Sequence, residues 1–357
     1  FDASVISGVI GFITADYNLG VWEIGLVVSA PTIGGILSSF FAAPLSDRFG
    51  RKTILLCIAV LYAVSAVFSA LAPNYETLII ARFLGGMAFA SLGLAPIYIS
   101  EISPAKSRGT MVSINQLNIM IGFSAAYFAN YLLLKTSQID ADWVRALHID
   151  SNTWRWMLGL EILPAVIYLL LLTGIPESPR WLAMHQRFDE AREVFKKLMS
   201  ESDMEAQLAE VKRGLNENPQ PVLIRLKQIF KPNLRLALII GIVISVVQQV
   251  TGINAIFFYA PTIFEHSGVG TNAAFAQAVY VGIINVIFTL VAMALIDRIG
   301  RKPLLIVGLS GIFLSMALCS YGFYKATYQL DQAAFETLQV QSESPSSLQS
   351  LESLVGK

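Results

Sequence analysis

Long apolar stretches alternate with short polar ones along most of the chain. Most of them reach the ~20 residues that an α-helix needs to cross a bilayer, at a rise of ~1.5 Å per residue. The pattern predicts an all-α membrane protein with nine spans. They fall at roughly 1–15, 22–46, 53–72, 76–99, 108–134, 154–174, 234–264, 272–296 and 303–324. Because the first stretch is too short for a complete span, we expect the sequence to begin inside its first helix.

Two polar segments interrupt this pattern. The segment 176–233 contains "DEAREVFKKLMSESDMEAQLAEVKRGL", whose apolar residues recur at helical spacing among many charges. A bilayer does not accept such a composition, so it predicts short surface helices. The second segment, 325–357, is rich in Ser and Gln and is expected to form a polar tail or loop.

A repeated hexapeptide predicts how the spans are organised. "DRFGRK" at 47–52 follows the second span, and "DRIGRK" at 297–302 follows the eighth. The two positions are equivalent if a unit of six spans is repeated. We expect an N-terminal half at 1–174 (helices 1–6), a cytoplasmic helical linker at 175–233, and a partial C-terminal half at 234–324 (helices 7–9). On this interpretation the last three helices of the second half are missing.

The composition supports a membrane protein and excludes other classes. Hydrophobic residues make up 55% and charged residues 14% of the 357 residues, against ~45–50% and ~25% in soluble domains. The formal net charge is zero, which offers no attraction for nucleic acid. Most of the 25 Lys and Arg residues lie in the loops after spans 2, 4, 6 and 8. The positive-inside rule places these loops in the cytoplasm, for a multi-pass protein of the plasma membrane or bacterial inner membrane.

Side chains suited to catalysis or metal binding are sparse. Cys57 and Cys319 lie in apolar runs, where we expect each thiol to be a small buried hydrophobe. The three histidines, His148, His185 and His266, lie in separate polar loops without ligand spacing. The spans contain no histidine and no nucleophile–base pair. We therefore expect no metal, no cofactor and no enzymatic activity.

Five motifs carry a resemblance to a known family. They are "DRFGRK", "EISPAKSRG" (101–109), "PESPRWL" (176–182), "QQVTGIN" (248–254) and "DRIGRK". Together they resemble the sugar porter family of the major facilitator superfamily, most closely its proton-coupled symporters. The resemblance implies two six-helix bundles that carry a monosaccharide or polyol by alternating access, with a proton as coupling ion, and that function as a monomer.

The charged residues of these motifs are implied to form a cytoplasmic gate between the two halves. Exposed ion pairs contribute only about 0–1 kcal/mol each, so several would be needed to hold one state. The alternative is that the hexapeptides only anchor tight turns at the membrane surface. One group is Asp47, Arg48, Arg51, Glu101 and Arg108, and its counterpart is Asp297, Arg298, Arg301, Glu177 and Arg180.

The motif "QQVTGIN" predicts a substrate site. It places Gln248, Gln249 and Asn254 in an apolar span, where each polar group costs free energy unless it is paired. Amides both donate and accept hydrogen bonds, which suits the hydroxyls of a neutral sugar. Gln248 and Asn254 diverge on an ideal helix, so we expect a break near Gly252, with Pro261 loosening the span further. The alternative for each amide is a hydrogen bond between helices.

The resemblance extends this site to other spans. Gln116 and Asn285 are implied to line the same cavity, and Phe258 and Tyr259 to supply an aromatic wall. The family often has tyrosine at the position of Phe258, so one hydroxyl contact is absent here.

Charged residues inside spans predict the coupling site. Asp2 and Arg82 lie in apolar surroundings, where charges are expensive and usually functional. Either a proton or the arginine can neutralise the carboxylate, which predicts a proton switch. The resemblance adds Glu161 as a second buried carboxylate. At ~1.5 Å per residue, Asp2 lies about 20 Å and Arg82 about 9 Å from the outer ends of their spans, so spacing alone leaves their contact open. The alternative is a static pair that fixes helix packing.

Two other functions remain open at this point. A passive uniporter would have the same fold, with Asp2 as the residue that distinguishes it from a symporter. A sugar sensor would bind without transport and signal through the helices of 176–233.

Overall fold

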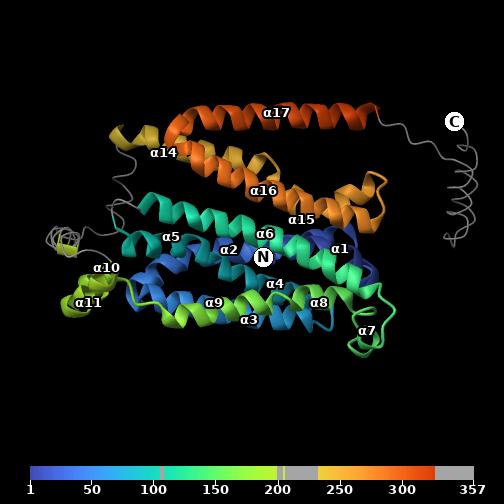
Figure 1. The fold of residues 1–357 in the computed structure, drawn as a ribbon, viewed down its shortest axis with the longest axis horizontal. Coiled ribbons are helices and arrows are strands. Elements are labelled where there is room, and N and C mark those ends of the chain that lie inside the picture. The colour runs from blue at the N-terminus through green and yellow to red at the C-terminus, as the bar shows by residue number, and fades with distance from the viewer. Residues whose placement is uncertain (105–107, 199–203, 206–231, 326–357) are drawn as a thin grey trace, which may run out of the picture. The chain divides into compact units, whose positions relative to one another are not determined.

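The computed structural model describes residues 1–104, 108–198, 204–205 and 232–325, which are almost entirely α-helical (Figure 1). Six helices run without interruption: α1 (Asp2–Tyr17), α2 (Val21–Phe49), α3 (Arg51–Ala70), α6 (Arg108–Ser137), α16 (Thr271–Ile299) and α17 (Arg301–Lys325). Three long segments are divided: α4 (Tyr75–Met87) with α5 (Ser91–Ile102), α8 (Thr153–Gly159) with α9 (Ile162–Gly174), and α14 (Pro232–Val250) with α15 (Ile253–His266). Shorter helices are α7 (Asp142–Ala146), α10 (Pro179–Met184) and α11 (Phe188–Leu198).

Eight helical segments among the described residues are long and apolar enough to cross a membrane. They coincide with the second to ninth predicted spans. The first predicted span forms α1, which has only 16 residues. Part of the polar segment 176–233 forms α10 and α11, and α10 is mostly buried. Residues 199–203, 206–231 and the tail 326–357 lie outside the described residues.

The chain forms two compact units, Phe1–Ala294 and Leu295–Lys357. In the first unit, α1 packs against α2, α6, α8 and α15. A helix that is apolar on all sides fits a protein core or a membrane, which agrees with the lack of an amphipathic pattern in the first 15 residues.

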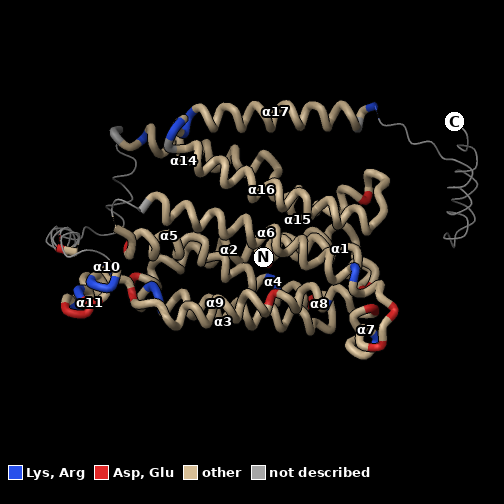
Figure 2. Tube along the Cα trace, viewed as in Figure 1, with Lys and Arg blue, Asp and Glu red and all other residues tan. Residues whose placement is uncertain are grey.

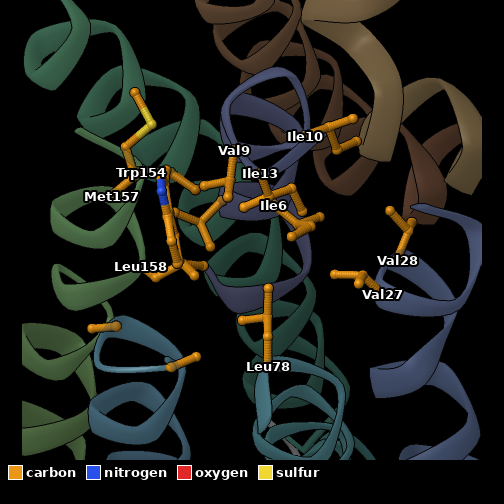
Figure 3. Close-up of a cluster of buried hydrophobic side chains, with 14 of the residues drawn as sticks. Ile6, Val9, Ile10, Ile13, Val27, Val28, Leu78, Trp154, Met157 and Leu158 are labelled. Atoms are coloured by element: carbon orange, nitrogen blue, oxygen red, sulfur yellow. The ribbon is translucent and has the colours of Figure 1, made fainter. Parts of the chain in front are cut away.

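The core around α1 joins several helices of the first unit. Ile6, Val9 and Ile13 of α1 are fully buried and belong to one apolar cluster with Trp154 of α8 and Leu78 of α4 (Figure 3). Val27 and Val28 add α2 to the same cluster. The cluster fixes α1 between the other helices and therefore fixes the position of its first turn.

Small residues bring α2 and α4 together backbone to backbone. A Cβ atom at Gly86 would lie 2.0 Å from the carbonyl oxygen of Pro31, and one at Gly34 would lie 2.2 Å from that of Phe83. Apolar attraction does not drive helices together in lipid, so close van der Waals packing through such residues has to stabilise the contact.

The charged residues gather at the ends of the helices of the bundle, apart from one cluster near α4 and α8 (Figure 2). Charged residues are otherwise sparse in the middle of the bundle, where a charge is costly.

Both cysteines correct a sequence prediction. Cys57 and Cys319 are free and exposed at the protein surface, not buried as predicted. An apolar run in a membrane protein has one face toward lipid, so apolar neighbours along the sequence do not distinguish the interior from that face.

We expect Gly86→Ala to destabilise the protein because the new methyl group must push α2 and α4 apart. Overpacking of this kind costs about 1–3 kcal/mol. Thermal unfolding of the purified protein would show a lower midpoint. Gly93→Ala is the matched control, because a Cβ at Gly93 meets nothing within 4 Å, and equal midpoints for the two variants would contradict the prediction.

Candidate functional site

Three charged side chains from three segments meet inside the first unit. The first turn of α1 carries Asp2, α4 carries Arg82, and Glu161 stands between α8 and α9. Their side chains are 6%, 2% and 1% exposed. Arg82 Nη1 forms ion pairs with Asp2 and, at 3.3 Å, with Glu161, so the helices bring together residues that the sequence left apart.

The cluster has more carboxylate than guanidinium. Arg82 contacts Asp2 through two groups, because Nη2 also donates to the Asp2 carbonyl oxygen at 3.3 Å, but it contacts Glu161 through Nη1 alone. Two buried atoms of the cluster, Asp2 Oδ2 and Arg82 Nε, have no hydrogen-bond partner. Two carboxylates facing one guanidinium carry an unpaired negative charge unless one of them holds a proton.

Close packing holds this cluster in place. Ser65 Oγ on α3 donates to the carbonyl oxygen of Ala81 on α4 at 2.7 Å. A Cβ at Gly85 would lie 2.4 Å from Ser65 Oγ and 3.4 Å from Asp2 Oδ2. The absence of a side chain at Gly85 therefore lets Asp2 approach α4.

The predicted break in the amide-bearing span is present. Gly252 adopts φ 75°, in the left-handed region, and separates α14 from α15. Thr251 Oγ1 donates to the carbonyl oxygen of Gln248 at 2.6 Å and closes the last turn of α14. A second irregularity at Tyr259, with φ −117° and ψ 16°, lies two residues before Pro261. The break at Gly252 confirms the expectation drawn from the sequence.

The break brings two amides together, and they differ from the pair that was expected. Asn254 Nδ2 donates to Gln249 Oε1 at 2.9 Å, and this contact crosses the break. Gln248 takes no part in it. Each amide uses one of its four hydrogen-bonding positions in this contact, and among the described residues Gln249 Nε2 remains as a donor and Asn254 Oδ1 as an acceptor. A donor and an acceptor side by side are what a sugar hydroxyl needs.

The face of α6 that carries Gln116 is turned toward α15. Phe123, seven residues after Gln116, packs its ring on Phe257 with centroids 5.1 Å apart. A separation of seven residues returns to nearly the same side of a helix. Asn254 lies one turn before Phe257 on α15, and Gln116 lies two turns before Phe123 on α6. Both amides are exposed, and both lie toward the N-terminal ends of their helices from the ring contact.

Asn285 on α16 lies on the same side. A Cβ at Gly282 would lie 2.9 Å from Ser124 Oγ of α6, so α16 touches α6 through Gly282. Asn285 follows one turn later and is partly buried. Phe258 and Tyr259 do not form an open wall in this structure, because both pack against the apolar cluster of α1.

A second charged cluster lies at the turn between α2 and α3. Arg51 is buried and pairs with Asp47 at 2.6 Å and with Glu101 of α5 at 3.2 Å. Ser178 Oγ donates to Glu101 Oε2 at 2.5 Å, and Trp181 Nε1 donates to the Asp47 carbonyl oxygen at 2.8 Å. This turn is thereby tied to α5 and to α10. Neither Ser178 nor Trp181 was singled out from the sequence, although both belong to "PESPRWL".

Glu177, which was grouped with the second hexapeptide, contacts the first one. Its Oε1 atom accepts hydrogen bonds from the backbone N–H of Lys52 at 3.0 Å and from that of Ser178 at 2.8 Å. The free N–H groups at the start of α3 attract a carboxylate, which explains the position. A Cβ at Gly50, where φ is 102°, would lie 2.3 Å from Glu177 Oε2, so this turn requires glycine.

The other residues of the predicted gate lie at the ends of their helices and in the turns. Arg180 and Arg298 are exposed, Arg301 is exposed at the start of α17, and Arg48 lies over the ring of Phe49. The side chains of Arg108 and Asp297 lie outside the described residues. No group of three or more metal-binding side chains occurs in the described part of the chain.

Comparison with known proteins gives consistent relatives. Residues 14–335 match the family described as "Sugar (and other) transporter". The chain is 40% identical over 325 residues to the arabinose-proton symporter of Bacillus subtilis, covering 91% of this chain and 68% of that protein. It is 39% identical over 323 residues to the D-xylose transporter of Levilactobacillus brevis, covering 90% of this chain and 67% of that protein. The chain thus spans about two thirds of the length of these relatives.

A solved structure has the same fold. The partially occluded inward open conformation of the xylose transporter XylE from E. coli is similar, with a TM-score of 0.76 and 31% identity, over 91% of this chain and 76% of that one.

The two carboxylates that pair with Arg51 should contribute unequally to stability. Glu101 is 7% exposed and Asp47 is 61% exposed. Glu101→Gln leaves a buried guanidinium poorly compensated and is expected to cost about 3 kcal/mol, whereas Asp47→Asn is expected to cost about 0–1 kcal/mol. Chemical denaturation of both purified variants checks the difference, and a larger loss for Asp47→Asn would contradict it.

Proposed function

Because the chain belongs to the sugar (and other) transporter family, we propose that it moves a monosaccharide or polyol across a membrane by alternating access, together with a proton. The observation that carries the proposal is the pair of amides at the break between α14 and α15, each of which makes only one side-chain hydrogen bond within the described residues. Relatives named for arabinose, D-xylose and galactose support neutral sugars as the substrates to test first.

The sugar site is proposed to lie between α6, α14, α15 and α16. Gln249 Nε2 would donate to one hydroxyl and Asn254 Oδ1 would accept from another. Gln116 and Asn285 face the same region from α6 and α16, and Gln248 follows on α14. Uncharged amides bind hydroxyls without favouring an acid or an amine.

The proton site is proposed to be the cluster of Asp2, Arg82 and Glu161. One proton neutralises the excess carboxylate charge of the cluster. In this proposal the ion pair between Arg82 and an ionised Asp2 links α4 to α1. A proton on Asp2 would release the guanidinium to Glu161 and weaken the hold of α4 on α1, which couples protonation to helix movement.

The gate is proposed to work from the cytoplasmic side. Asp47, Arg51, Glu101 and Glu177 form a rigid network within the first unit, which presents Arg48 and Arg180 at the surface. These would meet the charges of the second hexapeptide when that side closes, with each exposed pair worth about 0–1 kcal/mol.

We expect Gln116→Ala to weaken sugar binding about tenfold, because one lost hydroxyl contact is worth about 1.4 kcal/mol. Titration calorimetry of the purified protein with D-xylose, L-arabinose and D-galactose measures this. Asn118→Ala is the matched control, because Asn118 is an exposed amide about 200° around the same helix. Equal affinities for the Gln116→Ala variant and the unsubstituted protein would remove Gln116 from the site.

We expect Asp2→Asn to abolish acid-driven accumulation of labelled sugar while exchange of sugar across the membrane continues. An amide cannot take up the proton, so the switch is lost but the sugar site remains. Uptake into vesicles with and without a pH gradient measures both activities, with the exposed Asp142→Asn on α7 as control. Uptake that follows the sugar gradient alone, and is unchanged in Asp2→Asn, would indicate a passive uniporter.

A further inference from the structure

A proline in α15 frees a backbone carbonyl group. In an α-helix the carbonyl of residue i accepts from the N–H of residue i+4, so the carbonyl of Phe257 would accept from residue 261. That residue is Pro261, which has no N–H. The helix bends here, since Tyr259 departs from helical dihedral angles. An unpaired carbonyl is costly away from water, and Phe257 is buried.

A tyrosine from another helix supplies the missing donor. Tyr127 of α6 is buried, and its hydroxyl donates to the Phe257 carbonyl oxygen at 2.7 Å. Its ring belongs to an apolar cluster with Ala260 of α15 and Ala278 of α16. The hydrogen bond can form only while α15 lies against α6.

We propose that Tyr127 is a positioning residue that closes one end of the sugar site by binding the carbonyl that Pro261 leaves unpaired. Tyr127 lies one turn beyond Phe123 as seen from Gln116, so the contact holds α15 against α6 on the side away from the turn between α2 and α3. This inference rests on the proposed function, since it assigns the contact to one state of the transport cycle. Opening that end breaks the bond and exposes the carbonyl to water, which then becomes its partner.

A thiol reporter tests the contact without sugar or protons. In a background with Cys57→Ser and Cys319→Ser, the substitution Ala278→Cys places a thiol in the sealed cluster, where Ala278 is 1% exposed. Tyr127→Phe should raise the rate at which a maleimide labels this thiol by about threefold to tenfold, the population shift expected for one lost hydrogen bond. Unchanged labelling would overturn the proposal.

Two controls separate closure from general loosening. Tyr131→Phe removes a hydroxyl one turn away on α6 that makes no hydrogen bond within the described structure, and it should leave labelling unchanged. A reporter at Ala59→Cys, which is fully buried on α3, should stay protected in Tyr127→Phe. Faster labelling at both reporters would mean that the variant loosens the whole protein, and would also overturn the proposal.

Pro261→Ala tests the specific role of the freed carbonyl. Alanine returns an N–H that can bind the Phe257 carbonyl, so the hydroxyl of Tyr127 should matter less. In this background Tyr127→Phe should change labelling by less than about twofold. If Tyr127→Phe raises labelling as much with Pro261→Ala as it does with Pro261 present, the Tyr127 hydroxyl acts through a group other than the freed carbonyl. This result would refute the proposed role of the Phe257 carbonyl. If Pro261→Ala does not fold, the comparison of Tyr127→Phe with Tyr131→Phe still decides whether the hydroxyl closes this end.

Sugar uptake measured in parallel separates the two proposals. If labelling follows the prediction but the protein transports none of the sugars, the proposed function is contradicted. The contact between α6 and α15 is then still supported. Normal sugar uptake with unchanged labelling in Tyr127→Phe would contradict only the role of Tyr127.

Discussion

A guanidinium that water cannot reach must find its counter-charges inside the protein. Arg82 finds them on two other segments, Asp2 at the start of α1 and Glu161 between α8 and α9. Dehydrating these groups is expensive, and the attraction between them offsets the cost only when the helices stand in one arrangement. The packing of α1 against α8 and the close approach at Gly85 therefore serve the same end, because each keeps the carboxylates within reach of Arg82.

Uncharged polar groups within the membrane need partners for the same reason. Backbone and amide groups in a membrane must be paired within the protein or lie against water or ligand. Glu177 pairs the N–H groups that begin α3, and Tyr127 pairs a carbonyl that a proline leaves free. Gln249 and Asn254 make one hydrogen bond, to each other, and both are exposed, so their remaining donors and acceptors can reach water or a ligand.

Local rules predicted much of this from the sequence. Stretches of apolar residues located the spans, and the loss of helical register between Gln248 and Asn254 required the break that Gly252 provides. Distance along a helix did not predict that Asp2 and Arg82 meet. At a rise of ~1.5 Å per residue, the two residues lie at depths in the membrane that differ by about 11 Å, yet they form an ion pair. The tilt of each helix and the reach of the arginine side chain close that gap, and neither can be read from spacing.

Contacts between distant segments were the part that sequence could not supply. A motif shows which groups need partners but not which segment will bring them, so the contact between Glu177 and the first hexapeptide was not predicted. Tyr127 carried no signal of its own, since a tyrosine in an apolar span is ordinary. The signal was Pro261, which implies an unpaired carbonyl at Phe257 and hence a donor elsewhere. Listing the carbonyl groups that a proline leaves without a donor would have predicted that Phe257 needs a partner. Only the packing of α6 on α15 shows that this partner is Tyr127.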